Sequence, residues 1–167
     1  MKPSSLFPLV CSLVATVQAA AIGQTKSLIQ RDLPPGVPSV IQPSTPAPVP
    51  AGTTEIQIGF LNSLNYVFVA NTPSAALQIF SLLPQVLAQA AGVSTSSITV
   101  NRLAPLDTGA SLGYFTTLAK VHYPQNLIQT LQLQIQNPNS PLYQQQNSNL
   151  RSLVQQINPS INILGNN

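Results

Sequence analysis

Residue types that carry out catalysis are scarce in this 167-residue chain, and the single histidine, His122, is its only candidate general base at neutral pH. Asp107 and Ser111 lie close enough to His122 along the chain to suggest a Ser–His–Asp arrangement. Ser111 does not lie in the Gly-x-Ser-x-Gly turn that exposes the nucleophile of many hydrolases. A lone histidine in an alternating strand more often faces solvent, so we expect no hydrolase.

The carboxylates and cysteines are equally few. The acidic residues are Asp32, Glu55 and Asp107, and Asp32 lies in a proline-rich stretch far from the other two. Glycoside hydrolysis requires a pair of carboxylates across the scissile bond, and metal sites require clustered ligands. We therefore expect no catalytic residues, no metal site and no cofactor.

The first residues have the three zones of a secretory signal peptide. A lysine is followed by a mostly apolar stretch over residues 6–17 and then by small residues that suit signal peptidase. We expect cleavage between Ala19 and Ala20, which assigns residues 1–19 to the signal peptide. The apolar stretch is shorter than the roughly 20 residues that cross a bilayer. Cleavage would remove Cys11, the only cysteine, so the mature chain would form no disulfide.

Residues 20–52 have the composition of a linker or stalk. Prolines recur through this stretch and favour extended, polyproline-type conformations, and no apolar periodicity interrupts them. We predict a disordered Pro-rich arm. Ser39, Ser44 and Thr45 lie among the prolines, as O-glycosylated residues do in mucin-like stalks. An unmodified arm would have the same composition, so O-glycosylation of these three residues is a hypothesis.

Apolar alternation predicts the strands of a folded part that begins at residue 53. Alternation is clear over residues 55–60 and 114–123, and a β-branched run lies within residues 93–103. A second apolar set over residues 64–68 predicts either a bend in the first strand or a loop. Residues 161–164 are apolar enough for a short final strand.

Helical spacing separates these strands. Thr72 and Pro73 provide a helix start, and Gly92 provides a helix end that can adopt left-handed torsions. Pro84 lies inside this helix and should kink or break it. Further apolar stripes predict helices over residues 124–136 and from residue 148 to 157.

The order of these elements defines a fold class. The sequence β-α-β-β-α-β, with one additional short helix before the last strand, is that of the split β-α-β or ferredoxin-like fold. We predict an α+β sandwich over residues 53–167, with an antiparallel sheet that has its helices on one face. A domain of this length can bury a core that stabilises it without disulfides.

This organisation resembles that of known extracellular proteins. A signal peptide, a Pro/Ser/Thr stalk and this order of elements are similar to SEA-type modules of mucin-like proteins. Residues 56–66 (IQIGFLNSLNY), 112–114 and 157–161 resemble segments of fungal surface proteins that have no established activity. In that group a membrane anchor commonly follows the domain. Nothing apolar follows Leu164, so we expect no membrane span after signal removal and a protein that is released.

Self-cleavage is the chemistry that the resemblance to SEA-type modules implies. It requires a serine directly after a glycine in the turn between the central strands, where strain drives the hydroxyl onto the preceding carbonyl. Ala110 separates Gly109 from Ser111, so the Gly–Ser bond is missing. Ala110–Ser111 is a weak substitute, and we interpret these three residues as a plain hairpin turn in an uncut chain.

The charge indicates no polyanionic partner. Six basic and three acidic residues give a net charge of +3, and they are scattered along the chain. Nucleic-acid binding requires clustered Lys and Arg, and the aromatic run at 113–115, which faintly resembles an RNA-binding strand, lacks flanking basic residues. The predicted helices carry Gln, Asn and Ser where membrane-surface helices carry Lys and Arg. Such an uncharged surface suits glycans or is simply solvated.

These features predict a non-catalytic extracellular module of a secreted or cell-wall-associated protein, with a structural, adhesive or host-facing role. Its expected partners are cell-wall glycans or extracellular proteins. The alternative is a secreted effector-like protein that binds a partner protein, which an exposed apolar patch on the open face of the sheet would favour. A secreted hydrolase ranks third, and a pocket joining His122 to Asp107 or Glu55 would support it.

Overall fold

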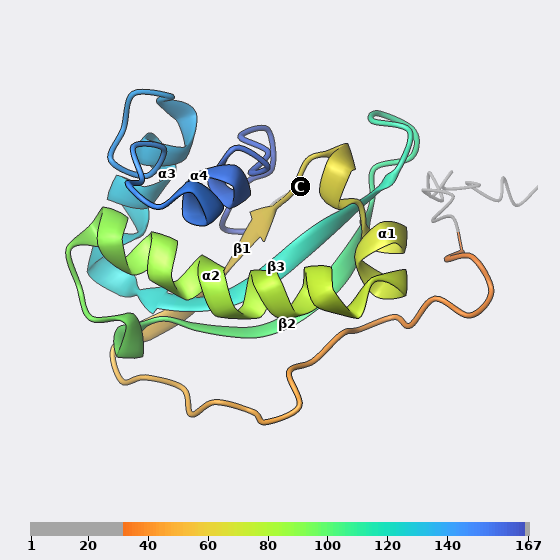
Figure 1. Cartoon of the computed structure of the whole chain (residues 1–167), viewed down its shortest axis with the longest axis horizontal. Coiled ribbons are helices and arrows are strands. Elements are labelled where there is room, and N and C mark those ends of the chain that lie inside the picture. The colour runs from red at the N-terminus through yellow and green to blue at the C-terminus, as the bar shows by residue number, and fades with distance from the viewer. Residues whose placement is uncertain (1–31, 166–167) are drawn as a thin grey trace, which may run out of the picture. The chain divides into compact units, whose positions relative to one another are not determined.

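An antiparallel sheet forms the centre of the computed structural model, which describes residues 32–165 (Figure 1). Strand β3 (Phe115–Pro124) lies between β1 (Thr53–Gly59) and β2 (Thr99–Asp107), and it is antiparallel to both. The predicted α+β class is confirmed, and the sheet order β1-β3-β2 is consistent with a ferredoxin-like fold.

The two faces of the sheet follow the alternation in the sequence. Ile56 pairs with Val121 and Ile58 pairs with Ala119, and all four side chains are buried against the helices. Their neighbours along each strand, including His122, lie on the opposite face, as side chains of alternating residues must. We call this the open face, although Gln57 on it is buried and its side chain donates to the carbonyl of Asn162 in the C-terminal segment. The predicted assignment of inward and outward residues on β1 and β3 is therefore correct.

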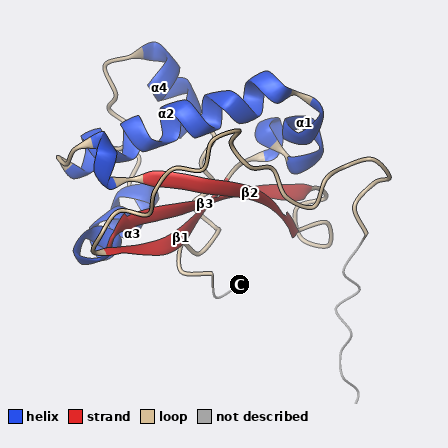
Figure 2. Cartoon of the chain, turned by 90° about the horizontal axis from the view of Figure 1, so that it is seen from below, coloured by secondary structure: helices blue, strands red, loops and turns tan. Residues whose placement is uncertain are grey.

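Helices cover one face of the sheet. Figure 2 shows α1, α2 and α4 together on one side of the strands, while α3 follows the end of β3 through a short 3-10 turn. The described helices are α1 (Tyr66–Asn71), α2 (Pro73–Ala91), α3 (Ile128–Gln136) and α4 (Ser148–Val154).

Helix α2 begins and ends where its sequence predicts. Pro73 occupies the first turn, and Gly92 ends the helix with a left-handed φ of 68°. Of the two outcomes expected at Pro84, a kink or a break, the break is wrong, because α2 continues through this residue. By length and composition α2 could also cross a membrane, but Ile79 and Leu83 are fully buried in the core, as in the central helix of a folded domain.

Helix α1 replaces the strand bend or loop that apolar alternation predicts at residues 64–68. The side chain of Asn65 accepts a hydrogen bond from the backbone N–H of Phe68 at 2.9 Å, which caps the helix. Tyr66 and Val69 are buried three residues apart, while Phe68 is exposed. The capping asparagine and the three-residue spacing therefore outweigh the alternation.

The C-terminal segment takes the place of a fourth strand without forming one. The backbone N–H of Gln57 donates to the carbonyl of Ile163 at 2.8 Å, and Phe60 forms an isolated bridge with Ile157. Residues 161–164 form turns, because the side chains of Asn158 and Asn162 accept backbone N–H groups two residues further on. The predicted short final strand is wrong, although the segment lies at the predicted edge.

The part of the Pro-rich arm that the structure describes, residues 32–52, runs extended over the folded domain (Figure 1). Ile41 and Leu103 exchange two backbone hydrogen bonds of 2.9 and 2.8 Å, which join the arm to the outer edge of β2. Composition predicts a disordered segment here. The difference arises from a few apolar residues spaced along the arm, which pack against the core.

Candidate functional site

The structure separates the residues that could have formed a Ser–His–Asp arrangement. On β3, His122 lies opposite Glu55 and Thr99, whereas Asp107 pairs with Phe115 at the other end of the strand. Seven positions along a strand correspond to roughly 23 Å. Ser111 lies in the turn beyond Asp107, so His122 cannot act on it.

Glu55 has a different partner. Its carboxylate forms an ion pair with Arg102 at 2.9 Å on the open face of the sheet, where both side chains are one-third exposed. An exposed pair of this kind contributes about 1 kcal/mol or less. None of the cavities described below is lined by Glu55, His122 or Asp107.

The turn between β2 and β3 contains the predicted Gly109, Ala110 and Ser111. The Asp107 side chain accepts the N–H of Gly109 at 2.9 Å. The Ser111 hydroxyl donates to the carbonyl of Thr108 at 3.3 Å, and that carbonyl also accepts the N–H groups of the next residues. The hydroxyl is thus engaged with the Thr108 carbonyl, whereas self-cleavage would require it to attack the carbonyl carbon of Ala110.

The predicted modification sites fall in two regions. Ser39, Ser44 and Thr45 are all exposed on the arm, where an enzyme could reach their hydroxyl groups. The predicted cleavage position between Ala19 and Ala20 lies outside the described residues.

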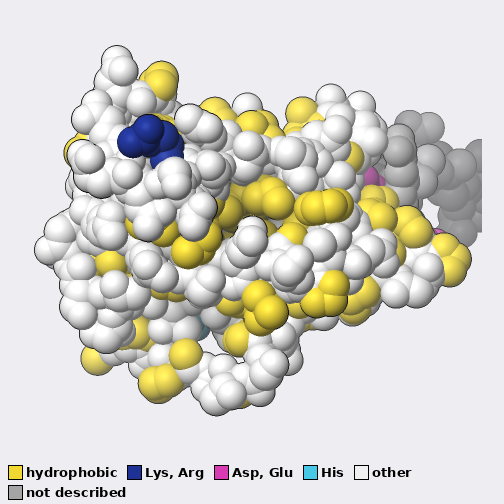
Figure 3. Space-filling view, viewed as in Figure 1, with side chains coloured by type: hydrophobic (Ala, Val, Ile, Leu, Met, Phe, Trp, Pro, Cys, Tyr) yellow, Lys and Arg dark blue, Asp and Glu magenta, His cyan; other side chains and the backbone are white. Residues whose placement is uncertain are grey.

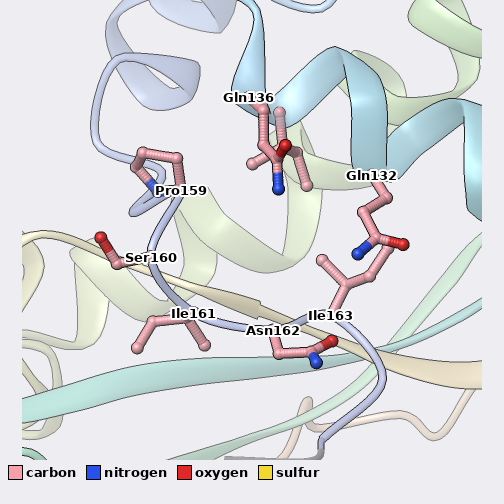
Figure 4. A pocket seen from close by; sticks show the side chains of 8 residues that line it. Gln132, Gln136, Pro159, Ser160, Ile161, Asn162 and Ile163 are labelled. Carbon is pink, nitrogen blue, oxygen red and sulfur yellow. The ribbon is translucent and has the colours of Figure 1, made fainter.

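A small cavity of about 160 Å³ lies between α3 and the C-terminal segment. Figure 4 shows Gln132 and Gln136 on α3 facing Asn162 and Ile163 across it. Half of its lining residues have polar side chains, namely Gln132, Gln136, Ser160 and Asn162. At this size it suits a few water molecules better than an organic ligand.

A larger groove runs between α1, α2 and α4 and has a volume of about 650 Å³. We call it the helix groove. Its floor is apolar and its rim carries neutral hydroxyl and amide groups, with no charged residue. Figure 3 shows apolar and uncharged side chains across most of this face. The lining residues are Ser63, Leu64, Phe68, Thr72, Ser74, Ala75, Gln78, Ser81, Leu82, Asn149, Ser152, Leu153 and Gln156.

Several rim groups of the helix groove are available to a ligand. Within the described residues, the side chains of Thr72, Ser74, Gln78 and Asn149 make no hydrogen bond to the protein. Phe68, in the same groove, keeps 45% of its surface exposed. Free donors and acceptors beside an exposed aromatic ring can bind a neutral, hydroxyl-rich molecule.

The sequence predicts a neutral polar surface but not this groove. Phe68 comes from α1, Gln78 from α2 and Asn149 from α4, so only the fold brings them together. The signal that sequence reasoning could have used is the absence of Asp, Glu, Lys, Arg and His between Glu55 and Arg102.

The fold and this surface define a small α+β module whose described residues assemble no catalytic triad. The profile of the MSB2 C-terminal domain family matches residues 38–157, and the chain belongs to this family. The match begins inside the arm, in agreement with the packing of the arm on the domain.

Curated relatives are fungal cell-surface proteins. The chain is 35% identical over 135 residues to the cell surface sensor MSB2 of Pyricularia oryzae, across 76% of this chain and 17% of the relative. It is 31% identical over 151 residues to the signaling mucin MSB2 of Saccharomyces cerevisiae, across 90% of this chain and 11% of the relative. The signaling mucin HKR1 of the same yeast is 25% identical over 211 residues, across 89% of this chain and 12% of the relative.

The chain thus spans less than a fifth of the length of these relatives. No solved structure matches it. The predicted resemblance to fungal cell-surface proteins is confirmed, while the relation to SEA-type modules stays a prediction.

Proposed function

We propose that this chain is a non-catalytic recognition module of a fungal cell-surface sensor, and that its helix groove binds a neutral glycan of the cell wall. The observation that carries the proposal is the uncharged groove, in which free hydroxyl and amide groups surround the exposed ring of Phe68. Sugar hydroxyls donate and accept hydrogen bonds, and the apolar face of a sugar ring packs on an aromatic side chain. Membership in a family that includes a cell surface sensor supports the proposed location at the cell surface.

The proposal includes the structural details that the sequence predicts. The module is SEA-like and remains uncut, because Ala110 interrupts the Gly–Ser bond and the Ser111 hydroxyl is held by Thr108. The signal peptide is removed before Ala20, and the protein is released or retained at the cell wall. The exposed Ser39, Ser44 and Thr45 carry O-linked glycans.

Binding to defined polysaccharides tests the groove. The secreted chain would be titrated with soluble oligosaccharides of β-glucan, of chitin and of mannan. We expect one of them to bind, and we expect Phe68→Ala and Gln78→Ala each to weaken its binding about tenfold, since each removes one direct contact.

Matched controls lie on α3, outside the groove. Leu133 is 70% exposed and Gln129 is also exposed, so Gln129→Ala repeats the change at Gln78 elsewhere, and Leu133→Ala removes a large exposed apolar side chain without removing an aromatic ring. The proposal is wrong if no oligosaccharide binds, or if the α3 variants weaken binding as much as the groove variants.

A second candidate function is binding of a partner protein. The open face of the sheet is charged around Glu55, Arg102 and Lys120, and none of the strongly exposed large apolar side chains belongs to a described strand. They lie on the helices, the arm and the loops instead, with Leu77 on α2 61% exposed. Crosslinking of intact cells through a photoreactive residue at position 77, followed by mass spectrometry, would detect such a partner.

A further inference from the structure

Along the outer edge of the sheet the described part of the arm forms only one backbone bridge, although its end continues directly into β1 and the Gly52 carbonyl accepts the N–H of Gln125 at 3.2 Å. β3 pairs with the inner edge of β2 along nearly the whole strand, whereas on the outer edge the described residues form a single bridge, Ile41 with Leu103. Two backbone hydrogen bonds make this bridge. A one-pair ladder lacks the neighbouring pairs that make strand association cooperative.

Few other contacts hold the arm. The hydroxyl of Tyr66 donates to the carbonyl of Pro38 at 2.8 Å, and Leu33 and Val37 are half-buried against the core. Near its C-terminal end, Thr99 donates to the carbonyl of Pro48 at 3.5 Å, a long hydrogen bond. Most other arm residues are exposed.

The arm also fits the helices loosely. A cavity of about 520 Å³ lies between residues 43–48 of the arm, helix α2 and the start of β2. A second cavity of about 450 Å³ lies between residues 38–44, α1 and α2. Both hollows are open to solvent, so the arm residues that line them make few contacts with the helices there. The arm therefore gains little from packing over much of its length.

We propose that residues 32–52 form a displaceable strap, which leaves the outer edge of β2 while the sheet and the four helices stay folded. Displacement uncovers the backbone N–H and C=O of Leu103 and the apolar side chains beneath the strap, which include Phe80, Ile98 and Val100. An uncovered strand edge can pair with another extended segment, so the strap controls access to this edge. The inference stands on the packing of the arm and is independent of the glycan proposal.

Hydrogen exchange measured on the full secreted chain by NMR tests the strap. The N–H of Leu103 donates to Ile41, so its exchange reports strap opening. We expect it to exchange about 100-fold faster than the paired amides of β1 and β3, because local opening requires less free energy than global unfolding. Equal exchange at Leu103 and in the β1–β3 ladder would show that the arm is part of the core and would overturn the proposal.

A disulfide clamp provides a second test. Residues that exchange both hydrogen bonds across antiparallel strands have Cα atoms about 5.5 Å apart, within disulfide range. The variant Ile41→Cys/Leu103→Cys would contain no competing thiol once the signal peptide with Cys11 is removed. We expect oxidation to slow exchange of the neighbouring strap amides to the rate of the ladder. The reduced form of the same variant is the matched control, and equal rates in both forms would overturn the proposal.

A variant outside the bridge keeps the test informative if the cysteines destabilise the core. Tyr66→Phe removes the hydroxyl that holds Pro38 and leaves the ring in place. We expect exchange at Leu103 to become about five- to tenfold faster, with exchange in the β1–β3 ladder unchanged. Faster exchange in both places by the same factor would indicate global destabilisation and would contradict the strap.

Discussion

Two buried tyrosines make the stability of this domain depend on pH. Tyr66 and Tyr123 are at most 1% exposed, and burial raises the pKa of each to about 12. The charged phenolate is disfavoured in the core because it would lose its hydration. Burial also raises the pKa of Tyr143, whose hydroxyl donates to the Ile135 carbonyl at 2.7 Å.

The raised pKa values of Tyr66 and Tyr123 predict that the domain loses stability at high pH. Below pH 10 both the folded and the unfolded chain keep the phenol protons, so the contribution is fully present. Above an ordinary pKa of 10.0 the unfolded chain loses its protons first, and the free energy of unfolding falls until pH reaches about 12. Urea denaturation between pH 8 and pH 12 should show this fall.

Over the same pH range, the free energy of unfolding of the variant Tyr66→Phe should fall by about 1–3 kcal/mol less than that of the wild type. Comparison of the two proteins cancels the titration of lysines, which both share. Parallel curves for variant and wild type would contradict the assignment to Tyr66.

At the level of elements, the fit between β1 and the C-terminal segment depends on one glycine. A Cβ atom on Gly59 would lie 2.6 Å from a side-chain carbon of Ile161, closer than atoms can pack. The backbone on both sides is fixed by hydrogen bonds between Asn158 and Gly59 and between Gln57 and Ile163. The segment cannot move away without losing one of them.

We therefore expect Gly59→Ala to destabilise the domain by about 1–3 kcal/mol, as overpacking does in other cores. The midpoint of urea denaturation measures the change. The double variant Gly59→Ala/Ile161→Gly should be more stable than the sum of the two single changes predicts, because glycine at position 161 removes every side-chain atom that the new Cβ would meet, including the Cβ of Ile161. Additive effects would show that Gly59 acts through another neighbour.

The elements differ in how far the sequence predicts them. Helix α2 and strands β1 and β3 have strong periodicity and clear termini, and they agree with prediction. Helix α1 and the C-terminal turns depend on asparagine side chains that bond to nearby backbone, and such local bonds leave little mark on a hydrophobic pattern. The packing of the arm depends on the pairing of Ile41 with Leu103, 62 positions away, and no local sequence pattern predicts such a distant pairing.

At the scale of the whole molecule, charged side chains and neutral hydrogen-bonding side chains lie on different faces. The open face of the sheet carries Glu55, Arg102, Lys120 and His122, whereas Arg151 is the only charged residue in the four described helices. Low charge overall is predictable from composition. This partition is not, because it depends on which residues the sheet turns away from the core.

Intact-mass measurement of the secreted protein tests the predicted processing of the whole chain. We expect one uncut polypeptide that begins at Ala20, with added mass in steps of one hexose. Replacement of Ser39, Ser44 and Thr45 by alanine should remove added mass, while the remaining chain keeps its length. A break between Gly109 and Leu112 would contradict the interpretation of that turn as inert.

The uncharged lining of the helix groove has a consequence for the surroundings in which the protein can work. At 0.1 M, dissolved salt largely screens the attraction between exposed charges that lie more than about 10 Å apart, but it has no such screening effect on contacts between neutral groups. A ligand held in the helix groove by neutral hydrogen bonds and an aromatic ring would therefore keep most of its affinity at both low and high salt concentration. Because the cell does not control the medium outside it, binding of a neutral ligand would then depend little on the ionic strength of that medium.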